Sequence, residues 1–192
     1  MEAAPATDAQ LLRAHSAGDA QAFARLYDRY DRACFHFVRR MLGAAHADAA
    51  EDLHQETWIS IAKSAAAFDP DKASFPTWLF TIARRKVWDH FRRQKVAVLV
   101  SADEESAMAA PDPGPTPLEQ VQSQELAQRM VTAIEALPLE QRSAFLLSAY
   151  GELPLSEIAL VTGVGLETAK TRLRYARVRL RQVLAAEEAD HV

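Results

Sequence analysis

The sequence predicts an all-α protein of two small helical domains joined by a proline-rich acidic linker. Apolar residues recur at helical spacing along most of the chain, and no strand-like alternation bounded by turn residues persists. Four prolines, Pro111, Pro113, Pro115 and Pro117, stand within seven positions and impose an extended backbone on that stretch. With 192 residues, the chain is long enough to bury a modest core on each side of the linker.

We place the first domain at residues 1–95, the linker at 96–118 and the second domain at 119–192. The last helix of the first domain has a clear start, because Ser74 is a candidate N-cap and Pro76 stands in the first turn, where its missing N–H costs nothing. The predicted helices are Asp8–Ala17, Asp19–Met41, Ala47–Ser64, Pro76–Lys95, Leu118–Ala136, Leu139–Tyr150, Leu155–Thr162 and Leu166–Glu188.

Composition points to a soluble cytoplasmic protein. The hydrophobic fraction is 49% and the charged fraction 25%, and no apolar run approaches the roughly 20 residues that span a bilayer. The first residues show no basic stretch followed by an apolar one, so we expect no signal peptide. The single cysteine, Cys34, cannot form an intramolecular disulfide, and we expect it to be a small buried residue.

The charge is distributed unevenly, although the net charge of -4 alone would argue against nucleic-acid binding. Twelve of the 22 Lys and Arg residues fall in two short clusters, and the acids of the intervening region have no Lys or Arg among them. The first cluster is Arg84, Arg85, Lys86, Arg92, Arg93 and Lys95; the second is Lys170, Arg172, Arg174, Arg177, Arg179 and Arg181. The acids between them are Asp103, Glu104, Glu105, Asp112, Glu119 and Glu125.

The second basic cluster lies in a predicted helix-turn-helix. Gly163 can take the left-handed conformation that ends one helix, Val164 can plug the corner, and Gly165 is an acceptable N-cap for the next. The inward face of the last helix is predicted to be Leu166, Ala169, Leu173, Ala176, Leu180 and Val183. The outward cations could read the major groove and bind phosphates, or they could be a solvated face favoured by the helix dipole.

The first basic cluster lies in a helix that also carries five aromatic residues. Most of these rings are predicted to be core, while the cations and the preceding loop, 69–74, could track a DNA backbone and hold unstacked bases. The rings are Phe75, Trp78, Phe80, Trp88 and Phe91.

Two segments resemble the extracytoplasmic-function sigma factors of the sigma-70 family. The segment from Ala50 to Arg93 resembles their region two, and the segment from Leu137 to Leu184 resembles their region four. The resemblance implies a subunit that brings RNA polymerase core to promoters. Its partners would be promoter DNA, the clamp helices and flap of the polymerase, and an anti-sigma factor. In this reading the core interface is Asp52, Leu53, Gln55 and Glu56, which could instead be a solvated acidic face.

The resemblance also assigns DNA contacts. Those to the minus-ten element would be Lys72, Ser74, Arg84, Arg85, Lys86, Asp89, Arg92 and Arg93. Those to the minus-thirty-five element would be Glu167, Thr168, Lys170, Thr171 and Arg174, with Arg172 and Arg177 on phosphates or structural. The sequence departs from the family at Pro154 and Gly165, where relatives usually carry a capping Ser or Thr.

The linker acids could mimic a nucleic-acid strand inside the polymerase or simply solvate the chain. We expect no catalytic residue, no metal and no cofactor. A metal site from Glu51, Asp52, His54 and Glu56 is disfavoured, because residues one or two apart on a helix point in different directions. Three alternatives to a sigma factor stay open: a sigma mimic that titrates an anti-sigma factor, a free-standing helix-turn-helix regulator and, more remotely, an enzyme.

Overall fold

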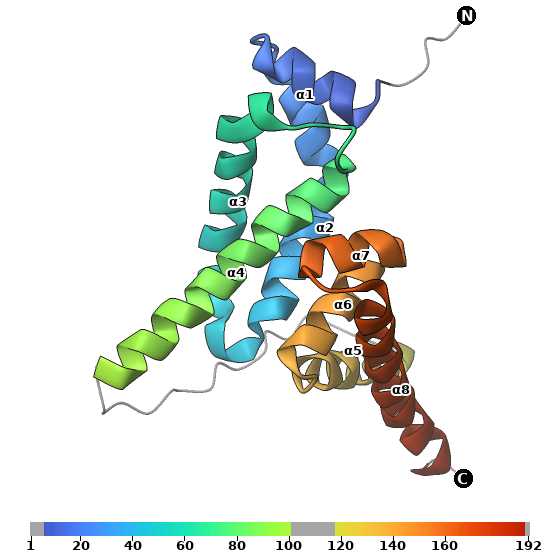
Figure 1. Cartoon of the computed structure of the whole chain (residues 1–192). Helices are drawn as coiled ribbons and strands as arrows, with labels where there is room; N and C mark the ends of the chain where they lie inside the picture. Colours follow the sequence, from blue (N-terminus) through green and yellow to red (C-terminus); the bar gives the residue numbers. More distant parts are fainter. Residues whose placement is uncertain (1–5, 101–117, 191–192) are drawn as a thin grey trace, which may run out of the picture.

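A computed structural model describes residues 6–100 and 118–190; of residues 96–100, 118–125, 184 and 186–190 it describes the backbone alone. Within these ranges the chain folds into helices joined by short turns, as the sequence predicts (Figure 1). The first group comprises α1 (Asp8–Ser16), α2 (Ala20–Leu42), the 3₁₀ turn η1 (Ala44–Ala49), α3 (Ala50–Ser64), the 3₁₀ turn η2 (Ala65–Ala67) and α4 (Phe75–Val100). The second comprises α5 (Leu118–Glu135), α6 (Leu139–Ala149), α7 (Leu155–Thr162) and α8 (Leu166–Asp190).

The helix starts of the first group are capped by side chains. Thr7 and Gln10 form a reciprocal capping box at α1, and the Asp19 carboxylate accepts from the backbone N–H groups of Gln21 (2.9 Å) and Ala22 (3.2 Å) at α2. The predicted cap of α4 is confirmed, since Ser74 Oγ accepts from the Thr77 N–H at 3.3 Å. These caps explain why the starts of α1, α2 and α4 could be placed to within about one residue.

The predicted helix boundaries differ from the structure by three residues or more at two places, and by one or two residues at several others. The segment before α3 is the 3₁₀ turn η1, so α3 begins at Ala50 rather than Ala47. Helix α4 ends at Val100, five residues beyond the predicted Lys95, because no proline or glycine interrupts the chain there. The first residues of the predicted linker are therefore helical, and residues 101–117, with their four prolines, lie outside the described residues.

The core of the first group forms where α2 crosses α4. Phe37 of α2 meets Phe80 of α4 edge to face, with 5.2 Å between ring centroids, and both rings are fully buried. Cys34 is also fully buried, as predicted, and burial raises the pKa of its thiol. Helix α1 is tied to α2 by Asp8, whose carboxylate accepts from Arg29 (2.7 Å) and from the Tyr30 hydroxyl (2.5 Å).

The second group is built around the α6, α7 and α8 contacts. The αL conformation predicted for Gly163 is confirmed, with φ 67° and ψ 33°, and Val164 packs against the core at the corner. On α8 the buried residues include Ala169, Leu173, Ala176 and Leu180. The inward position predicted for Leu166 is wrong, because half of that side chain is exposed.

Replacing Gly163 with Ala is expected to lower the free energy of unfolding by about 1 kcal/mol, because an L side chain is strained at this positive φ. No heavy atom lies within 4 Å of the position that a Cβ would take, so backbone strain is the whole effect. Urea unfolding followed by circular dichroism measures it. Gly165 has equal space and no positive φ, so Gly165→Ser should show no such loss; equal losses would contradict the explanation.

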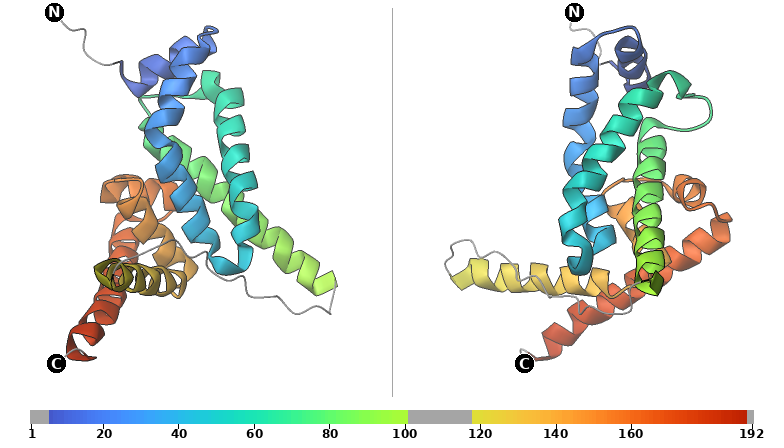
Figure 2. Two further views of the ribbon diagram at one scale, coloured as in Figure 1. Left: turned by 180° about the vertical axis from the view of Figure 1, so that it is seen from behind. Right: turned by 90° about the vertical axis from the view of Figure 1, so that its left-hand side faces the viewer.

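The two groups pack directly against each other, with α7 on α4 and with α5 and α6 on α2 (Figure 2). Arg142 Nη1 donates to the carbonyl of Met41 at 3.0 Å, and Glu135 Oε2 accepts from the Ala44 N–H at 3.0 Å. His36 stacks on Tyr150 with 5.5 Å between ring centroids. Among the described residues, no helix has the length and apolar character that crossing a bilayer requires.

Candidate nucleic-acid and polymerase interfaces

The loop before α4 presents one freely exposed cation. Lys72 is 81% exposed, and its ammonium lies 2.8 Å from the carboxylate of Asp69. Hydrogen bonds from Lys72 and from the Asp71 N–H lower the pKa of the Asp69 carboxyl. The loop is thus held by its own side chains, and Lys72 remains accessible to an external anion.

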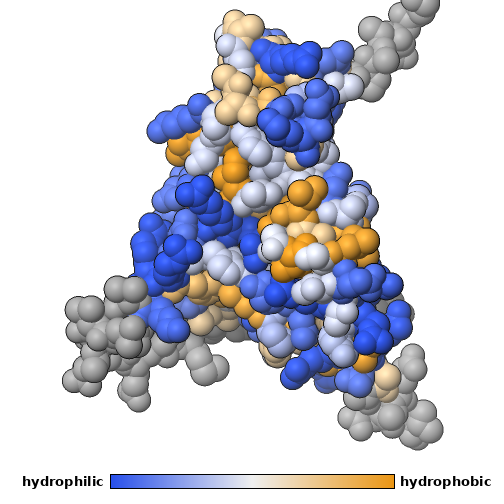
Figure 3. Space-filling model, in the orientation of Figure 1, coloured by the Kyte–Doolittle hydropathy of each residue, from blue (hydrophilic) through white to orange (hydrophobic). Residues whose placement is uncertain are grey.

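The candidate minus-ten residues on α4 fall into two sets. Arg85, Arg92 and Arg93 are exposed, and Asp89 lies 3.8 Å from Arg85 and 3.6 Å from Arg92. Arg84 and Lys86 instead form ion pairs within the protein, with Glu140 and Glu56. Arg85, Asp89 and Arg92 share one face of α4 at spacings of four and three residues, and Figure 3 shows hydrophilic side chains gathered over this part of the molecule.

Arg84 is engaged on several sides. Its guanidinium lies 3.9 Å from the ring centroid of Trp88, donates to Ser143 Oγ at 3.2 Å and pairs with Glu140 at 3.2 Å. Burial lowers the pKa of this guanidinium, and Glu140 opposes that shift. Lys86 pairs with Glu56 of α3 at 3.2 Å, which joins a candidate DNA residue to a candidate polymerase residue.

The aromatic rings of α4 serve the core, as predicted for most of them. Phe75 and Phe80 are buried, and Trp78, Trp88 and Phe91 are partly buried against the same core. Phe75, Trp78 and Phe68 contact one another, with centroids 5.1 to 6.2 Å apart. The rings therefore stiffen the helix that carries the exposed cations.

The outward face of α8 is polar and cationic. Glu167 and Lys170 are 81% and 63% exposed and lie 3.7 Å apart. Arg172 is different, because it lies between α8 and α6 and pairs with Glu140 at 3.0 Å. The exposed candidates are Glu167, Thr168, Lys170, Thr171, Arg174 and Arg177.

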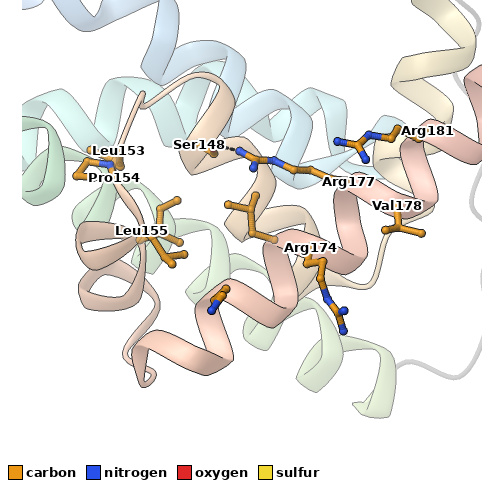
Figure 4. Close-up of a pocket in the computed structure, with 11 residues that line it drawn as sticks. Ser148, Leu153, Pro154, Leu155, Arg174, Arg177, Val178 and Arg181 are labelled. Atoms are coloured by element: carbon orange, nitrogen blue, oxygen red, sulfur yellow. Dashed lines mark hydrogen bonds between the residues drawn. The ribbon is translucent and has the colours of Figure 1, made fainter.

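A groove runs beside these residues, between α8 and the α6–α7 turn (Figure 4). Its cationic wall is Lys170, Arg174, Arg177 and Arg181, at spacings of three and four residues, and Arg177 donates to Ser148 at 3.1 Å. Apolar residues line the rest, namely Leu153, Pro154, Leu155, Ile158, Leu173 and Val178. The site prediction omitted Arg181, although its helical spacing from Arg174 and Arg177 could have found it.

Pro154 precedes α7 and supplies no side-chain capping bond, as expected from its missing hydroxyl. Its carbonyl still accepts from the N–H groups of Glu157 and Ile158, both at 3.0 Å. The helix start is therefore maintained by backbone bonds, and the ring of Pro154 lines the groove in place of a polar group.

The candidate polymerase residues lie on α3. Asp52, Gln55 and Glu56 are exposed, whereas Leu53 is 3% exposed and belongs to the core. Ile59, which the site prediction did not include, is 52% exposed one turn further along the same face. Ile59 is three and four residues beyond Glu56 and Gln55 and so shares their helix face. An apolar residue on that polar face is the signal that could have identified it.

The buried side of α3 carries His54. Trp58 Nε1 donates to His54 Nε2 at 3.0 Å, and Asp31 of α2 lies 3.0 Å from the same nitrogen. This histidine thus faces the core, away from Asp52 and Glu56. Within the described residues, no group of three or more His, Cys, Asp or Glu side chains could hold a metal ion.

Two family models match this chain. Sigma-70 region 2 matches residues 26–96, and Sigma-70, region 4 matches residues 127–180. The chain is 33% identical over 164 residues to the ECF RNA polymerase sigma factor RpoE of Cereibacter sphaeroides, covering 85% of this chain and 87% of the relative. It is 32% identical over 174 residues to SigW of Bacillus subtilis, covering 87% and 91%.

Solved structures share the fold. RpoE of Bartonella quintana, solved in complex with the anti-sigma factor NepR, aligns with a TM-score of 0.71 at 23% identity, covering 86% of this chain and 98% of that one. CnrH, solved with the cytosolic domain of CnrY, aligns with a TM-score of 0.65 at 23% identity, covering 93% and 97%.

Both matched regions occur in the expected order on the two helical groups, and together they span more than half of the chain. The chain belongs to the extracytoplasmic-function RNA polymerase sigma factors of the sigma-70 family. Its function is promoter-specific initiation of transcription with RNA polymerase.

Proposed function

We propose that the three surfaces divide the work of promoter recognition. The exposed α4 face and the loop before it bind the minus-ten element, the outward face of α8 reads the minus-thirty-five element, and the exposed face of α3 binds polymerase core. The chain contributes recognition and carries no catalytic chemistry of its own, and it acts in the bacterial cytoplasm. An anti-sigma factor is a further partner that we expect from the family.

The observation that carries the α8 assignment is the exposure of its N-terminal residues beside a cationic groove. Thr168, Lys170 and Thr171 project from the first turns, which are the part of a recognition helix that reaches base edges. Arg174 and Arg177 follow along the groove wall, where cations meet phosphates. Arg172 is occupied by Glu140, so we assign it a structural role in this conformation.

The α4 assignment depends on the difference between its two sets of cations. Arg85 and Arg92 are 83% and 74% exposed, and each pairs with Asp89 of the same helix, at 3.8 Å and 3.6 Å. Surface pairs of this kind contribute about 0–1 kcal/mol, so a phosphate can replace Asp89 at little cost. Arg84 and Lys86 are only 16% and 22% exposed and would first have to leave Glu140 and Glu56.

The experiment is co-elution of the purified chain with bacterial RNA polymerase core, followed by run-off transcription from a promoter upstream of its own gene. Co-elution together with a transcript supports the proposal. Failure to bind core under any condition would overturn it.

The α3 assignment predicts that Asp52→Lys weakens core binding by at least about 10-fold, because reversal of an interfacial charge costs more than about 1.4 kcal/mol. Asp28→Lys makes the same charge change on an exposed site of α2 and should leave core binding intact. Equal losses in both variants would contradict a specific role for the α3 face. Analytical size-exclusion chromatography or biolayer interferometry with core gives the comparison.

A further inference from the structure

Two side chains that we assign to the minus-ten element, Ser74 and Arg84, contact carboxylates of the second helical group. Ser74, in the loop that precedes α4, donates through Oγ to Glu157 Oε2 of α7 at 2.8 Å. The hydroxyl of Thr77, in the first turn of α4, contacts the same carboxylate oxygen. The Glu157 carboxylate therefore occupies two hydroxyl donors at the start of α4 that would otherwise be open to a phosphate oxygen.

A second glutamate, Glu140, contacts α4 about two turns beyond Thr77. Glu140 Oε2 accepts from Arg84 at 3.2 Å and from Arg172 of α8 at 3.0 Å. The side chains of Arg84 and Arg172 are only 16% and 25% exposed in this arrangement. One carboxylate thus engages a candidate minus-ten residue and a candidate minus-thirty-five residue together.

The two helical groups also pack closely against each other through side chains other than these two glutamates. A Cβ at Gly151 would lie 2.7 Å from the Leu147 carbonyl oxygen and 3.0 Å from the buried ring of Phe80, so Phe80 of the first group packs directly on the glycine of the second. The ring of His36 stacks on Tyr150, and Arg40 lies 3.7 Å from Glu135. The contact therefore combines apolar packing with ion pairs, as a specific interface does.

Carboxylate and phosphate oxygens compete for the same N–H and O–H donors. A guanidinium held by Glu140 and a hydroxyl held by Glu157 cannot donate the same hydrogens to DNA. We infer that the free chain closes on itself, with Glu140 and Glu157 as internal competitors of DNA phosphates, so that closure and DNA binding exclude each other. This inference uses the DNA-contact assignment of the proposed function, but closure itself does not depend on polymerase.

The test measures closure directly in the chain without polymerase. Fluorophores on cysteines introduced at Lys63 of α3 and Gln182 of α8, both exposed, report the separation of the two groups, and the buried Cys34 stays unlabelled. In Glu140→Gln/Glu157→Gln we expect energy transfer to fall and the affinity for a short labelled DNA duplex to rise roughly 10-fold, because the open fraction limits apparent affinity.

The control removes two negative charges elsewhere. Asp28→Asn/Glu51→Gln changes two exposed carboxylates outside the contact, so it matches the charge effect on DNA affinity and should leave energy transfer unchanged. Circular dichroism checks that both double variants are folded. Adding DNA to the parent chain should lower energy transfer as well.

Unchanged energy transfer in Glu140→Gln/Glu157→Gln, or an equal fall in the control, would overturn closure through these glutamates. DNA binding by the parent without any fall in energy transfer would overturn mutual exclusion. The proposed function would fail in a different assay, by the absence of co-elution with polymerase core. Energy transfer is measured without polymerase, so the two failures can be told apart.

Discussion

Replacing Arg142 with Met is expected to lower the free energy of unfolding by about 2–4 kcal/mol, because hydrogen bonds from a charged donor each contribute about 1.5–3 kcal/mol and part of that is recovered by apolar packing. Its guanidinium donates to the carbonyls of Met41 at 3.0 Å and Leu137 at 3.3 Å, and also to that of Glu135 at the end of α5. These carbonyls have no replacement donor on a methionine. Burial lowers the pKa of Arg142, and Glu135 opposes this shift.

Urea unfolding measures this loss, and a shift of the midpoint with unchanged slope identifies it as a change in stability. Arg179→Met removes an exposed arginine from α8 and should change the free energy of unfolding by no more than about 0.5 kcal/mol. A loss below about 1 kcal/mol in Arg142→Met would mean that water replaces the guanidinium at these carbonyls.

The combined substitution Lys170→Ala/Arg174→Ala is expected to reduce run-off transcription about 10- to 100-fold while core binding persists. Each direct base or phosphate contact contributes about 1–3 kcal/mol, and neither side chain supports the fold. Lys170 is 63% exposed with Glu167 3.7 Å away, and the Arg174 guanidinium lies 5.0 Å from the ring centroid of the exposed Tyr175.

Arg179→Ala is the control for the loss of a cation from α8 outside the groove, and it is compared with each single substitution, Lys170→Ala and Arg174→Ala. It removes a cation from the same helix, but Arg179 lies with Gln141, Tyr175 and Gln182 rather than in the groove wall. Its transcript should stay within about twofold of the parent, as surface substitutions away from contacts usually do. Equal losses in Arg179→Ala and in the single substitutions would show that total charge, rather than the groove, determines recognition.

Local signals in the sequence were sufficient for most of the fold. Ser74 and Gly163 mark helix ends through a cap and a left-handed residue, and both marks are confirmed. The end of α4 was placed too early because no local signal stands at Lys95, and helix propensity alone does not define where a helix stops. Leu166 was placed inside because its spacing fits the apolar face, yet at the first turn of α8 half of its side chain is exposed.

The candidate site could be predicted only in part. Exposure of Arg85, Lys170 and Arg174 follows from helical periodicity, which the sequence shows. The engagement of Arg84 and Ser74 does not, because Glu140 and Glu157 lie 56 and 83 positions away along the chain. Contacts between residues so far apart in the sequence depend on how the two helical groups pack on each other. Neither the spacing of residues nor the composition predicts that packing.

The hydroxyl of Ser74 acts in two directions at once. It accepts from the Thr77 N–H as the cap of α4, and it donates its single proton to Glu157. Losing Glu157 would free the donor and leave the accepting lone pair in place, so the first turn of α4 keeps its shape when its outer partner is exchanged. The turn is already ordered before DNA binds, so binding does not have to offset the conformational entropy of ordering it. A new hydrogen bond from Ser74 to DNA can therefore contribute to affinity with little reorganisation.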